Sequence, residues 1–151
     1  MKTGTKAKVR RSLVENGAPP EWNVRVMTVD DFYSYCDRDG IVVSEKPLGQ
    51  FGLYMLRDGR PEIHLHELLS GADWLFVGFH ELAHHWLSTM RIQFFQGRDM
   101  EPEYEADAVA ACAMIPRPLL ACCQPSEIAE LYGYSPNLIN LRREIFDRWQ
   151  I

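Results

Sequence analysis

The 151-residue sequence contains no apolar run that approaches the roughly eighteen residues of a membrane-spanning helix. Its basic N-terminal segment, MKTGTKAKVRR, is not followed by an apolar stretch, so it lacks the pattern of a secretory signal. Internal repeats and low-complexity segments are also absent. We therefore expect a soluble, cytoplasmic protein without membrane contacts, built as one compact domain with at most a small appendage.

The four cysteines lack the CxxC spacing of a zinc knuckle or a redox pair. Two of them, Cys122 and Cys123, are adjacent, which is awkward for a disulfide framework. We interpret these two, together with Cys36 and Cys112, as reduced and mostly buried thiols. A metal-binding or catalytic role for them is the less favoured alternative.

Charge is distributed unevenly along the chain. Residues 1–12 contain five basic and no acidic residues, and because the net charge is −5, the remaining residues carry −10. An acidic body is a poor general binder of phosphate backbone. We therefore expect residues 1–20 to form a flexible basic arm that is solvated, and we consider nucleic-acid binding unfavoured.

Local patterns predict an α+β fold. A helix is expected after Thr28, which can cap it, and should stop near Gly40. Short β-type runs separated by turn sequences predict a small, largely antiparallel sheet; they lie at 41–43, 52–56 and 62–66. Further helices are expected at 73–90, which is apolar on most sides, and at 104–114, 126–132 and 136–150.

The segment FHELAHHWL, at 79–87, contains the pattern HExxH. On a helix, His80 and His84 lie on one face and Glu81 lies about 100° around the axis. This arrangement suits a two-histidine zinc site beside a carboxylate general base. The alternative is a core helix whose histidines bond to neighbouring groups, but a metal satisfies these three polar side chains together, so we favour Zn²⁺. His85 points away from this face and is not expected to be a ligand.

A catalytic zinc site needs a third protein ligand and one open position. The downstream segment EPEYEADAVAACAMIP offers Glu101, Glu103 and Glu105. Pro102 favours a helix that starts near Glu103 and leaves Glu101 outside it. Glu103 and Glu105 then point about 200° apart, so only one of them can face the histidines. We predict Glu103 as the ligand, because it shares a face with Asp107, which could orient a ligand histidine.

These residues together predict hydrolytic chemistry. Zinc held by His80, His84 and Glu103 would activate water and polarise a carbonyl group, while Glu81 would transfer the proton to the leaving amine. The sequence does not fix the donor that would stabilise the oxyanion. His66, Tyr54 and Tyr104 remain open alternatives for it.

The motif HELAHHWL, followed by ExEAD and an alanine-rich segment that ends in M-I-P, resembles the ImmA/IrrE family of zinc metallopeptidases. The resemblance implies a compact gluzincin-like α+β fold, a metallopeptidase core at 21–121 and a helix-turn-helix-like helical extension at 122–151 that packs on the core. Characterised members cleave helix-turn-helix transcriptional repressors. The implied function is therefore a zinc endopeptidase that relieves repression by cleaving such a repressor, for example in a stress response.

The C-terminal segment could bind DNA, and the zinc could be structural instead of catalytic. From Arg117 onward the chain has four basic and four acidic residues, so we favour packing support or substrate docking over autonomous DNA binding by this segment. The alternative function is a non-proteolytic regulatory or antitoxin-like binding protein with a structural zinc. Glu81 argues against it, since a purely structural site has no need for a carboxylate directly after the first histidine.

Overall fold

The computed structural model describes residues 17–88 and 102–151. Most of the expected basic arm, and Glu101, lie outside the described residues. The elements follow the order α2 (Val29–Arg38), β1 (Val42–Lys46), β2 (Gly52–Arg57), β3 (Arg60–His66), α3 (Gly71–Ser88), α4 (Pro102–Met114), α5 (Arg117–Cys122), α6 (Pro125–Tyr132) and α7 (Pro136–Trp149). The expected α+β class is confirmed. None of the described helices has both the length and the apolar character that a membrane crossing requires.

The sheet has three strands in the order β1-β3-β2 and is mixed. Strands β2 and β3 form an antiparallel hairpin whose turn residues, Asp58 and Gly59, both have positive φ, as the common two-residue hairpin turn requires. Strand β1, in contrast, pairs parallel with β3. The expectation of a largely antiparallel sheet is therefore correct only for the hairpin. Strands β1 and β2 do run in opposite directions, but β3 lies between them. The turn sequences do not predict this strand order, because they report only on neighbouring residues.

Helix α2 is fixed at its start by local hydrogen bonds. The Thr28 side chain accepts a bond from the Asp31 backbone, and the Asp31 carboxylate accepts one from the Thr28 backbone, which together form a capping box. Arg25 donates two hydrogen bonds of 2.8 Å to the same carboxylate. The predicted Thr28 cap is confirmed.

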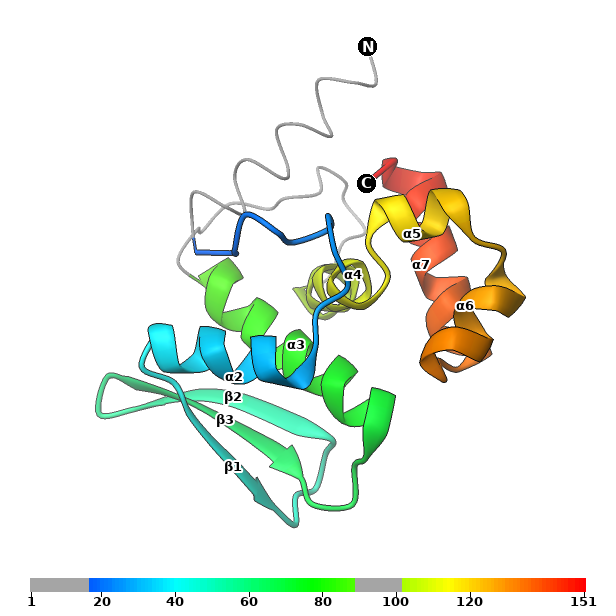
Figure 1. Ribbon diagram of the computed structural model, residues 1–151. Coiled ribbons are helices and arrows are strands. Elements are labelled where there is room, and N and C mark those ends of the chain that lie inside the picture. Colours follow the sequence, from blue (N-terminus) through cyan, green and yellow to red (C-terminus); the bar gives the residue numbers. More distant parts are fainter. Residues whose placement is uncertain (1–16, 89–101) are drawn as a thin grey trace.

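Helices α2 and α3 pack against the sheet, and α4 packs against α3 (Figure 1). Helix α3 begins two residues before its predicted start at Asp73, and its buried residues include Phe79, Leu82 and Trp86. Because one side of α3 lies on β2 and β3 and another lies on α4, little of its surface remains for solvent. This position explains why apolar residues occur on most of its sides.

Helix α4 begins at Pro102, two residues before the predicted start. Its five alanines are completely buried, which allows the close approach to α3; they are Ala106, Ala108, Ala110, Ala111 and Ala113. The irregular segment that precedes α2 is tied to the same helix. The indole nitrogen of Trp22 donates to the Val109 carbonyl at 3.0 Å, and the Met27 backbone donates to the Ala113 carbonyl at 3.0 Å.

The C-terminal helices are held to the end of α4 by a buried arginine. Arg142, on α7, donates to the carbonyls of Ile115 at 2.6 Å and Ile151 at 2.9 Å, and to the Asn23 side chain at 3.2 Å. Helices α6 and α7 agree closely with the prediction, whereas α5 was not predicted. It has only six residues, fewer than two helical turns, which is too short to show an apolar periodicity.

Two of the four cysteines, Cys122 and Cys123, are less buried than expected. All four are free, and Cys36 and Cys112 are buried as expected. Cys122 is exposed and Cys123 is only partly buried. Both lie at the C-terminal end of α5, where the short helix meets solvent, so the interpretation of mostly buried thiols is wrong for them.

Candidate metal centre

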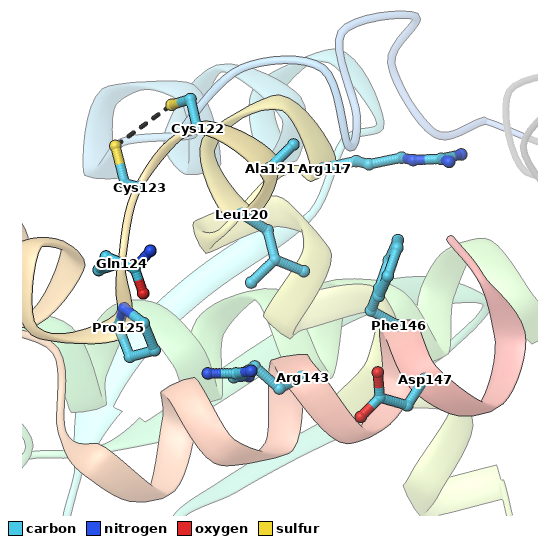
Figure 2. A pocket seen from close by; sticks show the side chains of 10 residues that line it. All are labelled: Arg117, Leu120, Ala121, Cys122, Cys123, Gln124, Pro125, Arg143, Phe146 and Asp147. Carbon is cyan, nitrogen blue, oxygen red and sulfur yellow. Dashed lines mark hydrogen bonds between the residues drawn. The ribbon is translucent and has the colours of Figure 1, made fainter.

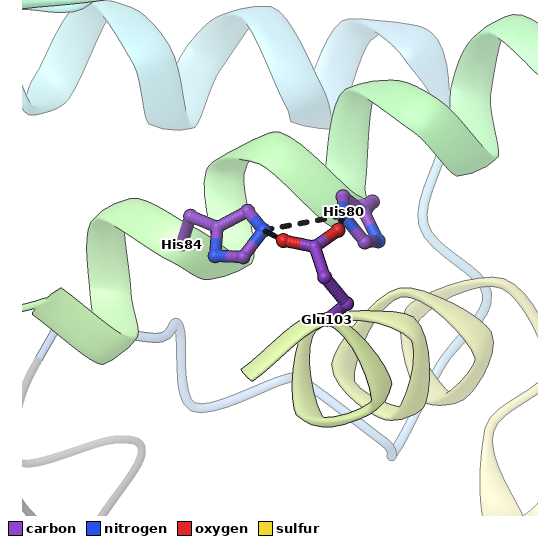
Figure 3. Close-up of side chains that lie close together, drawn as sticks. All are labelled: His80, His84 and Glu103. Carbon is purple, nitrogen blue, oxygen red and sulfur yellow. Dashed lines mark hydrogen bonds and ion pairs between the residues drawn. The ribbon is translucent and has the colours of Figure 1, made fainter. Parts of the chain in front are cut away.

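Two histidines of α3 and one glutamate of α4 converge on one point (Figure 3). His80 and His84, one helical turn apart, place their Nε2 atoms 3.2 Å from each other. The Glu103 carboxylate lies 3.0 Å from each of these nitrogens, through Oε2 to His80 and Oε1 to His84. The three side chains thus form one cluster whose ligand atoms lie within 4.8 Å of one another.

The spacing of these atoms fits a zinc ion. Tetrahedral zinc with ligand bonds of 2.0–2.1 Å separates neighbouring ligand atoms by about 3.3 Å. The observed separations of 3.0 to 3.2 Å are close to that value, so a small adjustment of the side chains would admit the ion. Two imidazoles and one carboxylate form a donor set typical of catalytic zinc, with a fourth position open.

The three side chains differ in their exposure. The side chains of His80 and His84 are 13% and 21% exposed, whereas that of Glu103 is 70% exposed. The histidines lie on α3, which packs on α4, and Glu103 reaches towards them from α4 (Figure 3).

Asp107 fixes the orientation of one histidine. Its Oδ1 atom lies 2.7 Å from Nδ1 of His80, which can donate a hydrogen bond and thereby leave Nε2 free for a metal. Burial lowers the pKa of His80, but the carboxylates of Asp107, Glu81 and Glu103 outweigh this effect, and the net shift is upward. Burial, together with the charge of His80, lowers the pKa of His84.

The Glu81 carboxylate is buried beside this cluster. The residue is 7% exposed, and its Oε1 atom lies 4.0 Å from Nε2 of His80. Burial raises the pKa of Glu81, opposed by the charge of His80 and by a hydrogen bond from the Tyr54 backbone. A carboxylate with a raised pKa is a stronger base than an exposed glutamate.

His85 lies away from the ligand cluster, as the helical geometry predicts. Its Nδ1 atom is 2.9 Å from the Tyr54 hydroxyl and its Nε2 atom is 3.5 Å from the Asp39 carboxylate. Burial lowers the pKa of His85. Its contacts tie α3 to β2 and to the end of α2.

The three residues considered for oxyanion stabilisation make other contacts. The Tyr54 hydroxyl bonds to His85, and the Tyr104 hydroxyl donates to Glu144 at 3.4 Å. His66 accepts a hydrogen bond from the Leu68 backbone at 3.1 Å. None of these contacts involves the ligand cluster.

Gly52, at the start of β2, was not among the residues predicted for the site. A β-carbon at this position would lie 2.6 Å from Cγ1 of Val77 and 3.0 Å from Oε1 of Glu81. The absence of a side chain therefore lets β2 approach the Glu81 carboxylate. An isolated glycine within a β-type run is a signal for such a close approach, and it could have been used.

An HExxH helix packed on a helix that supplies a third carboxylate is the arrangement of a metallopeptidase. Residues 36–143 match the family described as IrrE N-terminal-like domain, a peptidase family, and the protein belongs to it. This assignment confirms the resemblance found in the sequence and supports a metallopeptidase-type function. Comparisons with curated proteins and with solved structures gave no match.

Proposed function

We propose that the protein is a zinc-dependent endopeptidase in which His80, His84 and Glu103 hold the metal ion. The observation that carries this proposal is the buried Glu81 carboxylate, 4.0 Å from Nε2 of His80 and beside three side chains that could hold a metal ion. A structural zinc site has no need for a non-ligand carboxylate directly after its first histidine. When bound, zinc would supply a Lewis acid that activates water and polarises the scissile carbonyl group.

Glu81 would act as the general base. It would accept a proton from the attacking water and deliver it to the nitrogen of the leaving amine. Its burial raises its pKa, which suits a group that must both accept and release a proton near neutral pH. Asp107 would hold the His80 ring in the tautomer that presents Nε2 to the metal.

We further propose that the substrate is a helix-turn-helix transcriptional repressor and that cleavage relieves repression in the cytoplasm. The family membership of residues 36–143 supports a protein substrate. The repressor follows from the resemblance of the HExxH and ExEAD motifs to ImmA/IrrE peptidases. The C-terminal helices, braced on α4 by Arg142, would support the core and offer a docking surface for the substrate.

The test combines metal analysis with one conservative substitution. Zinc-loaded wild-type protein and Glu81→Gln would be incubated with the helix-turn-helix repressor encoded nearest to the gene, and cleavage would be followed by mass spectrometry. The variant should retain about one zinc per chain but lose cleavage, since it lacks only the base. Glu67→Gln, which changes an exposed carboxylate outside the cluster, is the matched control. Cleavage by Glu81→Gln at the wild-type rate would contradict the role of Glu81 as the base. No cleavage by the zinc-loaded wild type would instead favour the non-proteolytic binding protein.

A further inference from the structure

A pocket lies on the side of the molecule formed by α5, the connection to α6, and α7 (Figure 2). Its volume is about 390 Å³, within the range of sites that bind small molecules. Its lining includes two thiols, two guanidinium groups, one aromatic ring and one carboxylate, which belong to Cys122, Cys123, Arg117, Arg143, Phe146 and Asp147. No residue of the metal cluster contributes to it, so the pocket is a separate site.

The pocket contains two adjacent thiols. The Sγ atoms of Cys122 and Cys123 lie 3.2 Å apart, within hydrogen-bonding distance for sulfur. The Cys122 side chain, chiefly through this hydrogen bond, raises the pKa of Cys123. Because the Cys122 S–H can donate to the Leu119 carbonyl at 3.5 Å, its sulfur can accept a hydrogen bond from Cys123. Cys122 is exposed and Cys123 is only partly buried, so a small molecule can reach the pair.

The other two cysteines provide an internal contrast. Cys36 and Cys112 are 1% and 0% exposed. Burial raises the pKa of Cys36 to about 12 and that of Cys112 to about 11. Neither can readily form the thiolate that reacts with disulfides. Thiol reactivity should therefore concentrate in the pocket.

Two cations of the pocket are available to an anionic ligand. Arg117 and Arg143 are both exposed, and within residues 17–88 and 102–151 no carboxylate forms an ion pair with either one. The Arg117 guanidinium lies 5.7 Å from the centre of the Phe146 ring, which restricts its orientation. Guanidinium groups bind carboxylates in paired hydrogen bonds, and the two arginines outnumber Asp147, the one carboxylate that lines the pocket. The pocket therefore favours ligands that carry carboxylates.

We propose that this pocket is an S-thiolation site for a small disulfide that bears carboxylate groups, with Arg117 and Arg143 binding the carboxylates and Cys122 as the nucleophile. The Cys122 thiolate attacks one sulfur of the ligand, the ligand's S–S bond breaks, and one half leaves as a thiolate that takes up a proton. The other half stays on Cys122 as a mixed disulfide. One ligand disulfide is thus consumed, with one small thiol released and one protein thiol oxidised.

The adjacent thiol should not displace the bound half readily. Consecutive Cα atoms lie about 3.8 Å apart across a trans peptide, whereas disulfide-linked residues are usually separated by about 4.4 Å or more. A Cys122–Cys123 disulfide would therefore be strained. The mixed disulfide is the expected product, and Cys123 acts as the hydrogen-bond donor to the reacting sulfur.

The test compares two small disulfides of opposite charge on the intact, zinc-loaded protein. Oxidised glutathione carries carboxylates, and cystamine carries only ammonium groups. Each rate of modification, followed by mass spectrometry with peptide mapping, would be divided by the rate of the same reagent with the urea-unfolded protein. We expect one mixed disulfide per chain, on Cys122, with a normalised rate higher for oxidised glutathione. Cys36 and Cys112 should remain unmodified, and Cys122→Ser should abolish the reaction.

The double variant Arg117→Gln and Arg143→Gln isolates the role of charge. It should slow the reaction with oxidised glutathione about tenfold without slowing that with cystamine. Arg60→Gln, which changes an exposed arginine in the β2–β3 turn region, is the matched control and should change neither rate. Equal normalised rates for the two reagents, an unchanged rate in the double variant, or modification elsewhere than Cys122 would overturn the proposal. None of these outcomes depends on peptidase activity.

Discussion

Gly52 and Glu81 are neighbours across the interface between β2 and α3, and a β-carbon on Gly52 would lie 3.0 Å from the Oε1 atom of Glu81. The same β-carbon would lie 2.6 Å from Val77, which is too close for the neighbouring side chains to stay where they are. The position of the carboxylate therefore depends on the lack of a side chain at residue 52.

Gly52→Ala should consequently reduce catalysis without removing the metal. We expect kcat to fall about tenfold or more, because a displaced base transfers its proton less effectively, while KM changes little. Repressor cleavage would be measured together with the zinc content. Gly49→Ala is the matched control, since a β-carbon there meets nothing within 4 Å. Full activity of Gly52→Ala would show that the Glu81 position tolerates the methyl group.

Asp107→Ala should weaken metal binding although Asp107 is not itself expected to be a ligand. Loss of its 2.7 Å contact with His80 frees the imidazole ring, and losses of this kind typically cost about 10–100-fold in metal affinity. Competition with a zinc chelator would measure the change. Asp107→Asn, which retains a hydrogen-bond acceptor, should recover part of the affinity. If both variants bound zinc as tightly as the wild type, the orienting role would have to be abandoned.

Glu103→Gln and Glu105→Gln form a matched pair that tests the third ligand. Glu103 lies 3.0 Å from both histidines, while Glu105 is buried at 6% exposure on another side of α4. We expect Glu103→Gln to lose most of its zinc and Glu105→Gln to retain it. Elemental analysis of both proteins, prepared without chelator, would decide the matter. Selective loss in the Glu105 variant would reverse the assignment.

The pair formed by Arg25 and Asp31 should make stability depend on pH in the acidic range. The hydrogen bonds from Arg25 lower the pKa of Asp31 from 3.8 to about 2. A lowered pKa stabilises the fold above about pH 4, and this contribution disappears as the pH falls through 2. Because Arg25 is half exposed, solvent screening reduces the expected contribution to about 1 kcal/mol.

Asp31→Asn should therefore lower the free energy of unfolding by about 1 kcal/mol near neutral pH. The difference from the wild type should shrink towards zero near pH 2. Urea unfolding of both proteins at several pH values would measure it, and Asp30→Asn, at an exposed position of the same helical turn, is the control. A difference that stays constant with pH would assign the effect to the capping geometry alone.

Local sequence patterns determined several elements of this protein. The capping residues Thr28 and Ser135 mark the starts of α2 and α7, because N-cap bonds join residues only three positions apart. The helical spacing of His80 and His84 places both rings on one face for the same reason, since four residues make about one turn. Such features depend only on near neighbours in the chain, so the order of the residues is enough to specify them.

Tertiary packing alone decided how these elements meet. The sequence predicted that the third metal ligand is a glutamate on one face of α4. Only the packing of α3 on α4 brings Glu103 to 3.0 Å from both histidines. The insertion of β3 between β1 and β2, and the accessible thiols of Cys122 and Cys123, likewise had no local signal. These relationships join residues distant in sequence, and which surfaces come together depends on the burial of the whole core rather than on any single segment.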